Sequence, residues 1–326
     1  MPGRHEAAMT RRDFVGRLGA GVLALGAAGS VARGQGSPKV GIAQSEHVLV
    51  DGAVRPYTVG EMIDRAVMFV TGAASADAAW SGLFSADEVV GIKPNGLGGY
   101  GCSTDPAVIT HCIQRLHGVG VRPESILLWE DRPNNLDACS LSVDEPLLGA
   151  RSHLIQSDLT EPITHGSLTD RFFRPLVNDV DAVLNLPILK AHPICGVTLA
   201  MKNHYGSLAD PSAQHFDRCN TPMVDLADMP FIRDKTRLVV CDGTRARIQG
   251  QAYGEPEYYP NVVMAATDPV AHDTVGYHII EDERERRGIA PLKGSDLEPR
   301  YIAMAAERGL GVADLESIDY EVIDLA

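Results

Sequence analysis

Lysine is scarce in this 326-residue sequence. Of 29 basic residues only six are lysines, and all the others are arginines. A general preference for arginine explains this shortage on the surface. Burial can lower the pKa of a lysine, however, and its compact charge differs from the planar guanidinium of arginine. The lysines that stand beside proline, asparagine or histidine are therefore our first candidate site residues: Lys93, Lys190 and Lys202. The alternative for each is a structural salt bridge.

Several signatures of known chemistry are missing. The sequence has no G-x-S-x-G elbow, no Walker loop and no H-E-x-x-H, which argues against acyl transfer, P-loop nucleotide binding and a zinc hydrolase. Its six cysteines form neither C-x-x-C nor a ferredoxin-type run, so we predict no iron–sulfur cluster ligated within this chain. Cys112 and Cys241 lie in apolar runs, where buried free thiols are expected.

A basic surface is also missing, since the formal net charge is −14. So acidic a chain is a poor partner for nucleic acid or anionic lipid. Beyond the extreme N-terminus, no apolar run reaches the length of a membrane-spanning helix. We therefore predict no nucleic-acid partner and no membrane insertion once the N-terminal leader is removed.

Residues 1–32 have the pattern of a twin-arginine signal peptide. The segment 10–15 (TRRDFV) precedes an apolar stretch that extends to about Ala28, and Ser30-Val31-Ala32 supplies small residues for cleavage. The alternative is a stray arginine pair before a membrane anchor. Export by this route carries folded proteins, often with a cofactor already inserted. We expect a periplasmic or extracellular protein in which 33–326 form one α/β domain.

The mature chain alternates strand and helix patterns. A strand expected at 88–92 runs into a glycine-rich loop, Asp105-Pro106 then starts a helix to about Leu116, and the next strand is expected at 126–129. Further strands are expected at 39–44, 182–186, 237–241, 262–266 and 320–323, and helices at 59–70, 269–280 and 298–308. This rhythm predicts an α/β fold with a mostly parallel sheet flanked by helices. The irregular stretches 131–180 and 207–236 are predicted to form a cleft or lid.

Polar residues follow the expected strands, and ligands of open α/β sheets bind beyond the carboxyl ends of strands. The stretch 181–206 is the richest, with two lysines and two histidines beside an apolar run. We predict Lys190, His192 and Lys202 as catalytic residues, and His192 and His204 as candidate metal ligands. The predicted substrate- or cofactor-binding residues are Lys93, Asn95, Gly98, Asn203, Glu130, Asp131 and Asp242. Gly98 belongs to a glycine-rich loop that could present backbone N–H groups to an anion.

These segments resemble the uncharacterised "domain of unknown function 362" family. The resemblance rests on VVGIKPN (89–95), Thr104-Asp105-Pro106, DAVLNLPILKAH (181–192), GVTLAMKNHYG (196–206), VVCDG (239–243) and TDPVAHDTVG (267–276), and spans roughly 88–280. It implies an α/β fold. Some relatives carry an appended iron–sulfur module, so a separate redox partner for this chain stays open.

A more distant resemblance is to lactate racemase-type nickel-pincer enzymes, which place lysines and histidines around a nucleotide-derived cofactor. It would involve Lys190, His192 and Lys202, and no motif matches closely.

Three hypotheses follow. The first is an exported enzyme that acts on a small anionic substrate, carboxylate or phosphate, by lysine and histidine acid–base chemistry, with or without a metal or cofactor. The second is a non-catalytic metal- or cofactor-binding or maturation protein that serves a redox partner. The third is a buried ionic network, which predicts that every lysine is paired with a carboxylate and that no open volume remains.

Overall fold

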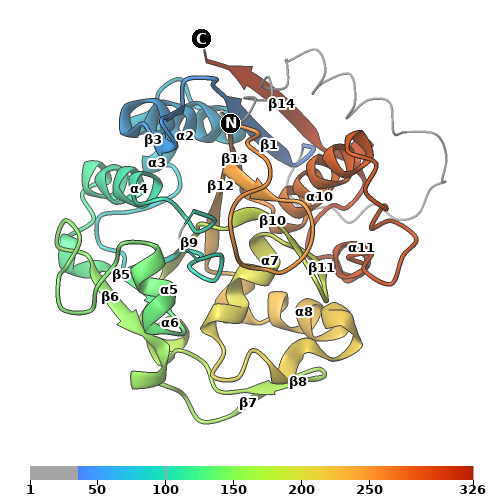
Figure 1. Cartoon of the computed structure of the whole chain (residues 1–326). Coiled ribbons are helices and arrows are strands. Elements are labelled where there is room, and N and C mark those ends of the chain that lie inside the picture. The colour runs from blue at the N-terminus through green and yellow to red at the C-terminus, as the bar shows by residue number, and fades with distance from the viewer. Residues whose placement is uncertain (1–35, 100, 326) are drawn as a thin grey trace.

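The computed structural model describes residues 36–99 and 101–325, and its centre is a ten-stranded sheet (Figure 1). The strand order is β14-β1-β13-β12-β9-β4-β5-β6, while β10 pairs with β12 and β11 pairs with β10. Neighbours are parallel, except that β13 is antiparallel to β1 and β12, and β11 is antiparallel to β10. The strands are β1 (Lys39–Gln44), β4 (Val90–Lys93), β5 (Ile126–Glu130), β6 (Arg151–Leu154), β9 (Ala182–Asn185), β10 (Ile188–His192), β11 (Gly196–Thr198), β12 (Thr236–Arg247), β13 (Val262–Ala266) and β14 (Asp319–Asp324).

Helices cover both faces of the sheet, and a separate apolar core lies on each side. One face carries α2 (Pro56–Thr71), α3 (Ala76–Ser81) and α4 (Pro106–Val119). The other carries α7 (Ala200–Asn203), α8 (Asn220–Ala227), α10 (Pro269–Arg286) and α11 (Tyr301–Glu307). The buried strands β4 and β9 are apolar except at their last residues, Lys93 and Asn185, as expected for parallel strands covered on both faces. The predicted α/β fold with a mostly parallel sheet flanked by helices is confirmed.

The remaining elements are short. Two hairpins, β2 (Leu49–Val50) with β3 (Ala53–Val54) and β7 (Ile163–His165) with β8 (Leu168–Asp170), lie outside the main sheet. The short helices are α5 (Pro133–Ala138), α6 (Arg174–Asn178) and α9 (Pro230–Arg233), and the 3-10 turns are η1 (Pro123–Ser125), η2 (Ile155–Ser157), η3 (His204–Ser207), η4 (Ala213–Cys219) and η5 (Leu315–Ser317). Among the described residues, no helix has the length and apolar character needed to span a membrane.

The Asp-Pro pairs begin helices as the sequence predicts. The carboxylate of Asp105 accepts a hydrogen bond from the Ala107 N–H, and Pro106 is the first residue of α4. Asp268 accepts from the N–H groups of Val270 and Ala271 and begins α10 in the same way. Each aspartate satisfies N–H groups that have no partner within the helix.

The structure corrects the end of one predicted strand and adds a strand to the sheet. The strand expected to end at Cys241 continues to Arg247, because β12 pairs first with β9 and then with β10 along its length. Asp242 is therefore a buried residue inside a strand and not at its end. The stretch 131–180, predicted to be irregular, also contains the strand β6, which pairs with β5 and extends the sheet. The predicted signal peptide, 1–32, lies outside the described residues.

Candidate functional site

A cavity of about 150 Å³ lies beyond the carboxyl ends of β4 and β10. Most of the predicted site residues line it: Lys93, Asn95, Glu130, Asp131, His192, Lys202 and Asn203. The remaining lining side chains come mainly from the α7–η4 segment and from the loops after β4 and β5, and include Thr198, Tyr205, Arg132, Asn135, Pro211, Ser212 and His215. Parallel strands thus bring residues that are more than a hundred positions apart to one rim of the sheet.

One wall of the cavity is a buried ion pair. Lys93 Nζ donates to Glu130 Oε1 at 2.9 Å and to the Pro94 carbonyl at 2.6 Å, and both side chains of the ion pair are almost fully buried. The Gly96 N–H donates to the same Glu130 oxygen at 2.8 Å. Burial raises the pKa of Glu130, while Lys93 and the Gly96 amide oppose that change. The ion pair fixes the Pro94–Gly96 loop against the end of β5.

Behind this loop, a chain of hydrogen bonds sets the orientation of the asparagine side chains. Lys190 Nζ donates to Asn95 Oδ1 at 3.0 Å, and Asn95 Nδ2 donates to Asn203 Oδ1 at 2.8 Å. Asn203 Nδ2 donates in turn to Asn185 Oδ1 at 2.7 Å and to the Lys93 carbonyl at 2.9 Å. An ammonium group can only donate, so Lys190 determines which end of the Asn95 amide is oxygen. The second Nδ2 hydrogen of Asn95 remains available to a ligand.

Lys190 itself does not line the cavity. It is 0% exposed and lies behind Asn95, and its side chain forms no ion pair with a carboxylate among the described residues. Burial lowers the pKa of Lys190 to about 8. The structure therefore places this predicted catalytic residue where it holds Asn95 in position, one side chain away from any ligand.

Lys202 is the cation that faces the cavity. Its Nζ lies 3.2 Å from His215 Nε2 and 3.3 Å from the centre of the Tyr205 ring. His215 Nδ1 is 2.8 Å from the Pro211 carbonyl, which can only accept, so Nδ1 carries a hydrogen and a neutral ring presents an Nε2 lone pair to Lys202. Burial lowers the pKa of Lys202 well below its ordinary value, and Lys190 adds to this effect.

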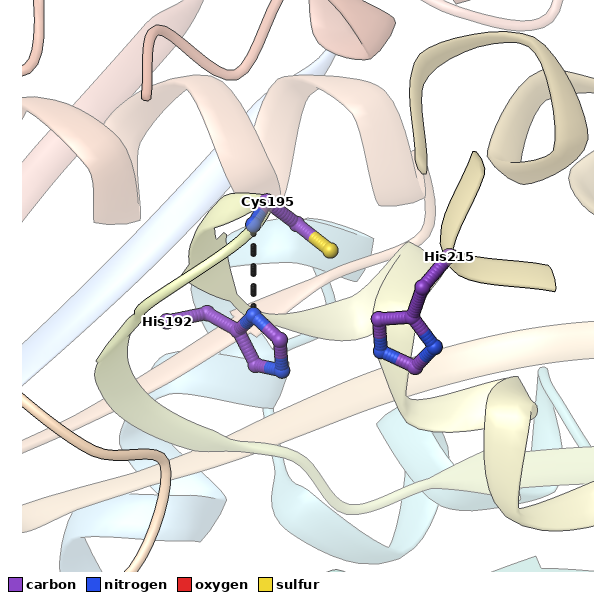
Figure 2. Close-up of side chains that lie close together, drawn as sticks. All are labelled: His192, Cys195 and His215. Atoms are coloured by element: carbon purple, nitrogen blue, oxygen red, sulfur yellow. Dashed lines mark hydrogen bonds between the residues drawn. The ribbon is translucent and has the colours of Figure 1, made fainter. Parts of the chain in front are cut away.

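His192 faces His215 across the site, with ring centroids 5.6 Å apart (Figure 2). The backbone N–H groups of Ile194 and Cys195 both donate to His192 Nδ1 at 3.2 Å. Burial lowers the pKa of His192 to about 2, and the charge of Lys202 adds to this. A neutral ring that accepts at Nδ1 must carry its hydrogen on Nε2. His192 therefore offers an N–H donor at the cavity.

The short helix α7 carries Lys202 and Asn203, and a residue of α10 holds its start. Asp273 accepts from the Ala200 N–H at 2.7 Å and from the Met201 N–H at 3.0 Å, one bond to each carboxylate oxygen. These amides open α7 and have no partner within it. The completely buried Asp273 thus positions the lysine of the site from 71 residues away.

The ionic-network hypothesis fails. It requires each lysine to be paired with a carboxylate, yet in the described chain only Lys93 of the three site lysines has such a partner. It also requires the absence of open volume, whereas a cavity is present.

Besides Lys190, three more predicted residues lie outside the cavity. Gly98 packs so closely against the Cys102 carbonyl that a Cβ atom would lie 1.5 Å from it. Asp242 accepts from the Asp105 N–H and from Thr244, which ties β12 to the start of α4. His204 lines a second cavity.

That second cavity is larger, about 360 Å³, but its charged side chains are engaged. Arg233 pairs with Asp228 and Asp234. Asp268 accepts three backbone N–H groups, from Val270, Ala271 and Val312. The smaller cavity is the better candidate because it contains the unpaired cation.

A group of three potential metal ligands lies beside the smaller cavity. The ligand atoms of His192, Cys195 and His215 all lie within 4.8 Å of one another (Figure 2). Cys195, however, forms a disulfide with Cys219, so its sulfur is not a thiolate in this state. The predicted ligand His204 is not part of the group.

The other four cysteines are free and buried, which confirms the prediction for Cys112 and Cys241.

Four residues of the site were not predicted: Asn185, Tyr205, His215 and Asp273. Asn185 had a signal, since it is a polar residue at the end of an otherwise apolar strand. His215 lies in the irregular stretch 207–236, where no periodic pattern indicates direction.

The fold and the site define an α/β protein with a buried cationic cavity at the carboxyl edge of its sheet. Residues 147–278 match the model of a family described as "Domain of unknown function (DUF362)". The match includes Lys190, His192, Lys202 and His215, but it begins after Lys93 and Asn95. It is therefore narrower than the resemblance seen over 88–280.

The remaining comparisons are with curated proteins and with solved structures. No curated protein matches the chain. A protein from Thermotoga maritima with a crystal structure is similar at 11% sequence identity and a TM-score of 0.46, over 73% of this chain and 60% of that one. The chain thus spans less than two thirds of that protein.

Proposed function

We propose that the cavity binds a small molecule with a carboxylate or phosphate group and that the protein is an enzyme that transfers a proton on this molecule. The observation that carries the proposal is Lys202, a buried cation that lines the cavity and has no carboxylate partner among the described residues. An unpaired buried charge is costly, and an anionic ligand removes that cost.

The size of the cavity limits the ligand. In another protein, a cavity of about 150 Å³ holds one benzene molecule. The cavity here has a similar volume of about 150 Å³ and therefore suits a group of roughly six non-hydrogen atoms. A short carboxylic acid or a small phosphate ester fits this volume. Together with the acidic net charge, this supports a small metabolite over a polymer as the ligand.

Three donors from separate elements converge on the ligand. Lys202 supplies a charge-assisted donor, Asn95 supplies its second amide hydrogen, and His192 supplies Nε2–H. Lys190 holds the Asn95 amide in this orientation. Lys93 completes the wall through its ion pair with Glu130.

The same arrangement supports proton transfer. Burial lowers the pKa of Lys202 well below its ordinary value, so this lysine releases its own proton more readily and can then accept one from the carbon next to a bound carboxylate. His215 accepts a hydrogen bond from Lys202 and so directs its Nζ group. The neutral imidazole of His192 can donate to the oxygen that gains charge.

Calorimetry with a panel of two- to five-carbon acids and phosphate esters tests binding, and proton NMR in D₂O tests exchange of the hydrogen next to the carboxylate. We expect Lys202→Met to weaken binding at least tenfold and to abolish exchange, whereas Lys293→Met, at an exposed position, changes neither. Unchanged binding in Lys202→Met would refute the proposal. Binding without exchange would instead support the non-catalytic alternative, a cofactor- or metal-binding protein that serves a redox partner.

Export by the twin-arginine route stays part of this proposal. The Cys195–Cys219 disulfide supports an oxidising compartment such as the periplasm, where such bonds persist.

A further inference from the structure

The disulfide connects two short sequence pairs that each hold an imidazole and a thiol. The first is His192-x-x-Cys195, from the end of β10, and the second is His215-x-x-x-Cys219, within η4. Tetrahedral zinc sites take two ligands from each of two turns at spacings of this kind. Neither pair alone is a site, but the structure brings both together beside the same cavity.

We propose that reduction of the Cys195–Cys219 disulfide converts this cluster into a tetrahedral Zn²⁺ site formed by His192, Cys195, His215 and Cys219. The reductant is a dithiol, which gives two electrons and two protons and becomes a disulfide as the Cys195–Cys219 bond breaks. Zn²⁺ then binds the two cysteines as thiolates and releases two protons to solvent.

The geometry favours this second state. Three of the four ligand atoms, from His192, Cys195 and His215, already lie within 4.8 Å of one another. Figure 2 shows these three side chains close together. The fourth residue, Cys219, is covalently bonded to Cys195 and therefore lies in the same place. When the disulfide opens, its two thiolates can bind a metal together with the two imidazoles. Such a set of ligands selects zinc over calcium or magnesium.

His215 is already oriented as a metal ligand. Its Nδ1–H donates to the Pro211 carbonyl at 2.8 Å, which leaves the Nε2 lone pair free to bind a metal. Metal-binding histidines are commonly fixed by such a bond from the other ring nitrogen. In the disulfide state Lys202 occupies this lone pair, so the metal must displace it. The two thiolates balance the charge of the metal next to that lysine.

His192 must change its hydrogen bonds before it can bind a metal. In the disulfide state its Nδ1 accepts from the N–H groups of Ile194 and Cys195, which places the ring hydrogen on Nε2 and excludes ligation through that atom. Both amides belong to the loop that ends at Cys195. Ligation by His192 therefore requires the ring to give up its Nε2 hydrogen or to break these two bonds from Ile194 and Cys195. The disulfide excludes the metal by using both sulfurs, while the two amide bonds hold the tautomer that does not bind through Nε2.

Metal binding would withdraw His192 and His215 from the cavity. This consequence rests on the proposed function and predicts that the reduced, zinc-loaded protein binds the small anion more weakly. The site itself does not depend on that function, because it is defined by its own four residues.

Cobalt is the probe for the metal site, because Co²⁺ in a tetrahedral thiolate site absorbs strongly in the visible and near-ultraviolet. Protein purified with its disulfide intact is compared with protein reduced by a dithiol and separated from it. We expect one Co²⁺ per reduced chain, displaced by Zn²⁺, and at least a hundredfold weaker binding to the oxidised chain. Equal metal binding in both states, or none in the reduced state, would overturn the proposal.

Variants assign the ligands. His215→Ala changes a half-buried loop residue and should fold, and we expect it to weaken Co²⁺ binding at least tenfold. Cys195→Ser should remove most of the thiolate absorption, whereas Cys112→Ala, at a free thiol in α4, should keep the full signal. Absorption that persists in both His215→Ala and Cys195→Ser would overturn the assignment. These measurements use metal alone, so their failure is distinguishable from failure of the proposed anion binding.

Discussion

At the scale of single residues, Gly206 shows how little space surrounds the buried ion pair. A Cβ atom at this position would lie 2.7 Å from Lys93 Cε, 2.8 Å from Lys93 Nζ and 3.2 Å from Glu130 Oε2. Gly206→Ala would therefore push the lysine away from its carboxylate. We expect a stability loss of about 1–3 kcal/mol, typical of a disturbed hydrogen bond to a charged group, and a clear loss of ligand affinity.

Urea unfolding and calorimetry measure both effects. The matched control is Gly118→Ala, because no atom lies within 4 Å of the added carbon and the residue is inside α4. There, alanine should stabilise the helix by about 0.5–1 kcal/mol. An alanine at position 206 that behaved like the control would contradict the close packing described for Lys93.

Lys190 shows what single residues do not reveal in a sequence. Its identity and its position after an apolar run predict that it lies near the carboxyl ends of the strands, and the structure places it within β10. Lys190 and His192 share one face of β10, but they are two positions apart, which is a distance of about 7 Å along the strand. The lysine therefore lies deeper, and Asn95 stands between it and the cavity. The distance of a residue from the cavity depends on side chains of other strands. A local sequence pattern contains no information on them.

At the scale of elements, the strands and the Asp-Pro helix starts were predictable because their causes are local. Apolar runs of strand length and capping aspartates act within a few residues. By contrast, α7 is four residues long, and its first amides are satisfied by Asp273 of α10. The end of β12 likewise depends on its pairing with β10. Elements fixed by distant partners could not be located from their own sequences.

The same dependence predicts the effect of Asp273→Asn. An asparagine keeps one acceptor oxygen, but its NH₂ group would face one of the two α7 amides, so two donors would meet. We expect a loss of about 2–3 kcal/mol in unfolding free energy, since a buried donor is left without an acceptor. Amide hydrogen exchange should accelerate at residues 200–203, and ligand affinity should fall with the displacement of Lys202.

Asp314→Asn is the control for this change. Asp314 is an exposed residue that caps the turn η5, and it accepts a hydrogen bond from the Glu316 N–H. Its carboxylate, like that of Asp273, accepts from a backbone amide at the start of a helical turn, but in its own segment. Its substitution should cost less than about 1 kcal/mol. Equal small effects of the two substitutions would show that Asp273 does not hold α7 in place.

At the scale of the whole molecule, two layers of helices and a sheet leave one rim where polar groups gather, and this much followed from the sequence. The rim is completed by η4, which brings His215 and Cys219 from the irregular stretch 207–236. The disulfide and the hydrogen bond to Lys202 tie that segment to the sheet. A segment without periodicity gives no direction to its side chains, so its part in the site became visible only in three dimensions.

The stability of the whole molecule should depend on pH through His204. This residue is 2% exposed, both its ring nitrogens lack a hydrogen-bond partner in the described chain, and burial lowers its pKa to about 3. An unfolded histidine has a pKa of about 6.5, so below that pH the unfolded state binds one more proton than the folded state. Stability should therefore be unaffected by His204 above about pH 7.5 and should fall as the pH decreases from about 6.5 toward 3. The limiting slope is about 1.4 kcal/mol per pH unit.

Urea unfolding of wild type and His204→Leu between pH 5 and pH 8 isolates this contribution from that of the carboxylates. The leucine leaves no buried polar atom unpaired, so we expect it to be at least as stable as wild type at pH 8. Its advantage should grow as the pH falls, and His47→Leu, at an exposed position, is the control for the exchange of histidine for leucine. Parallel stability curves for wild type and His204→Leu would mean that His204 becomes protonated in the folded protein, and that a partner or water reaches its ring.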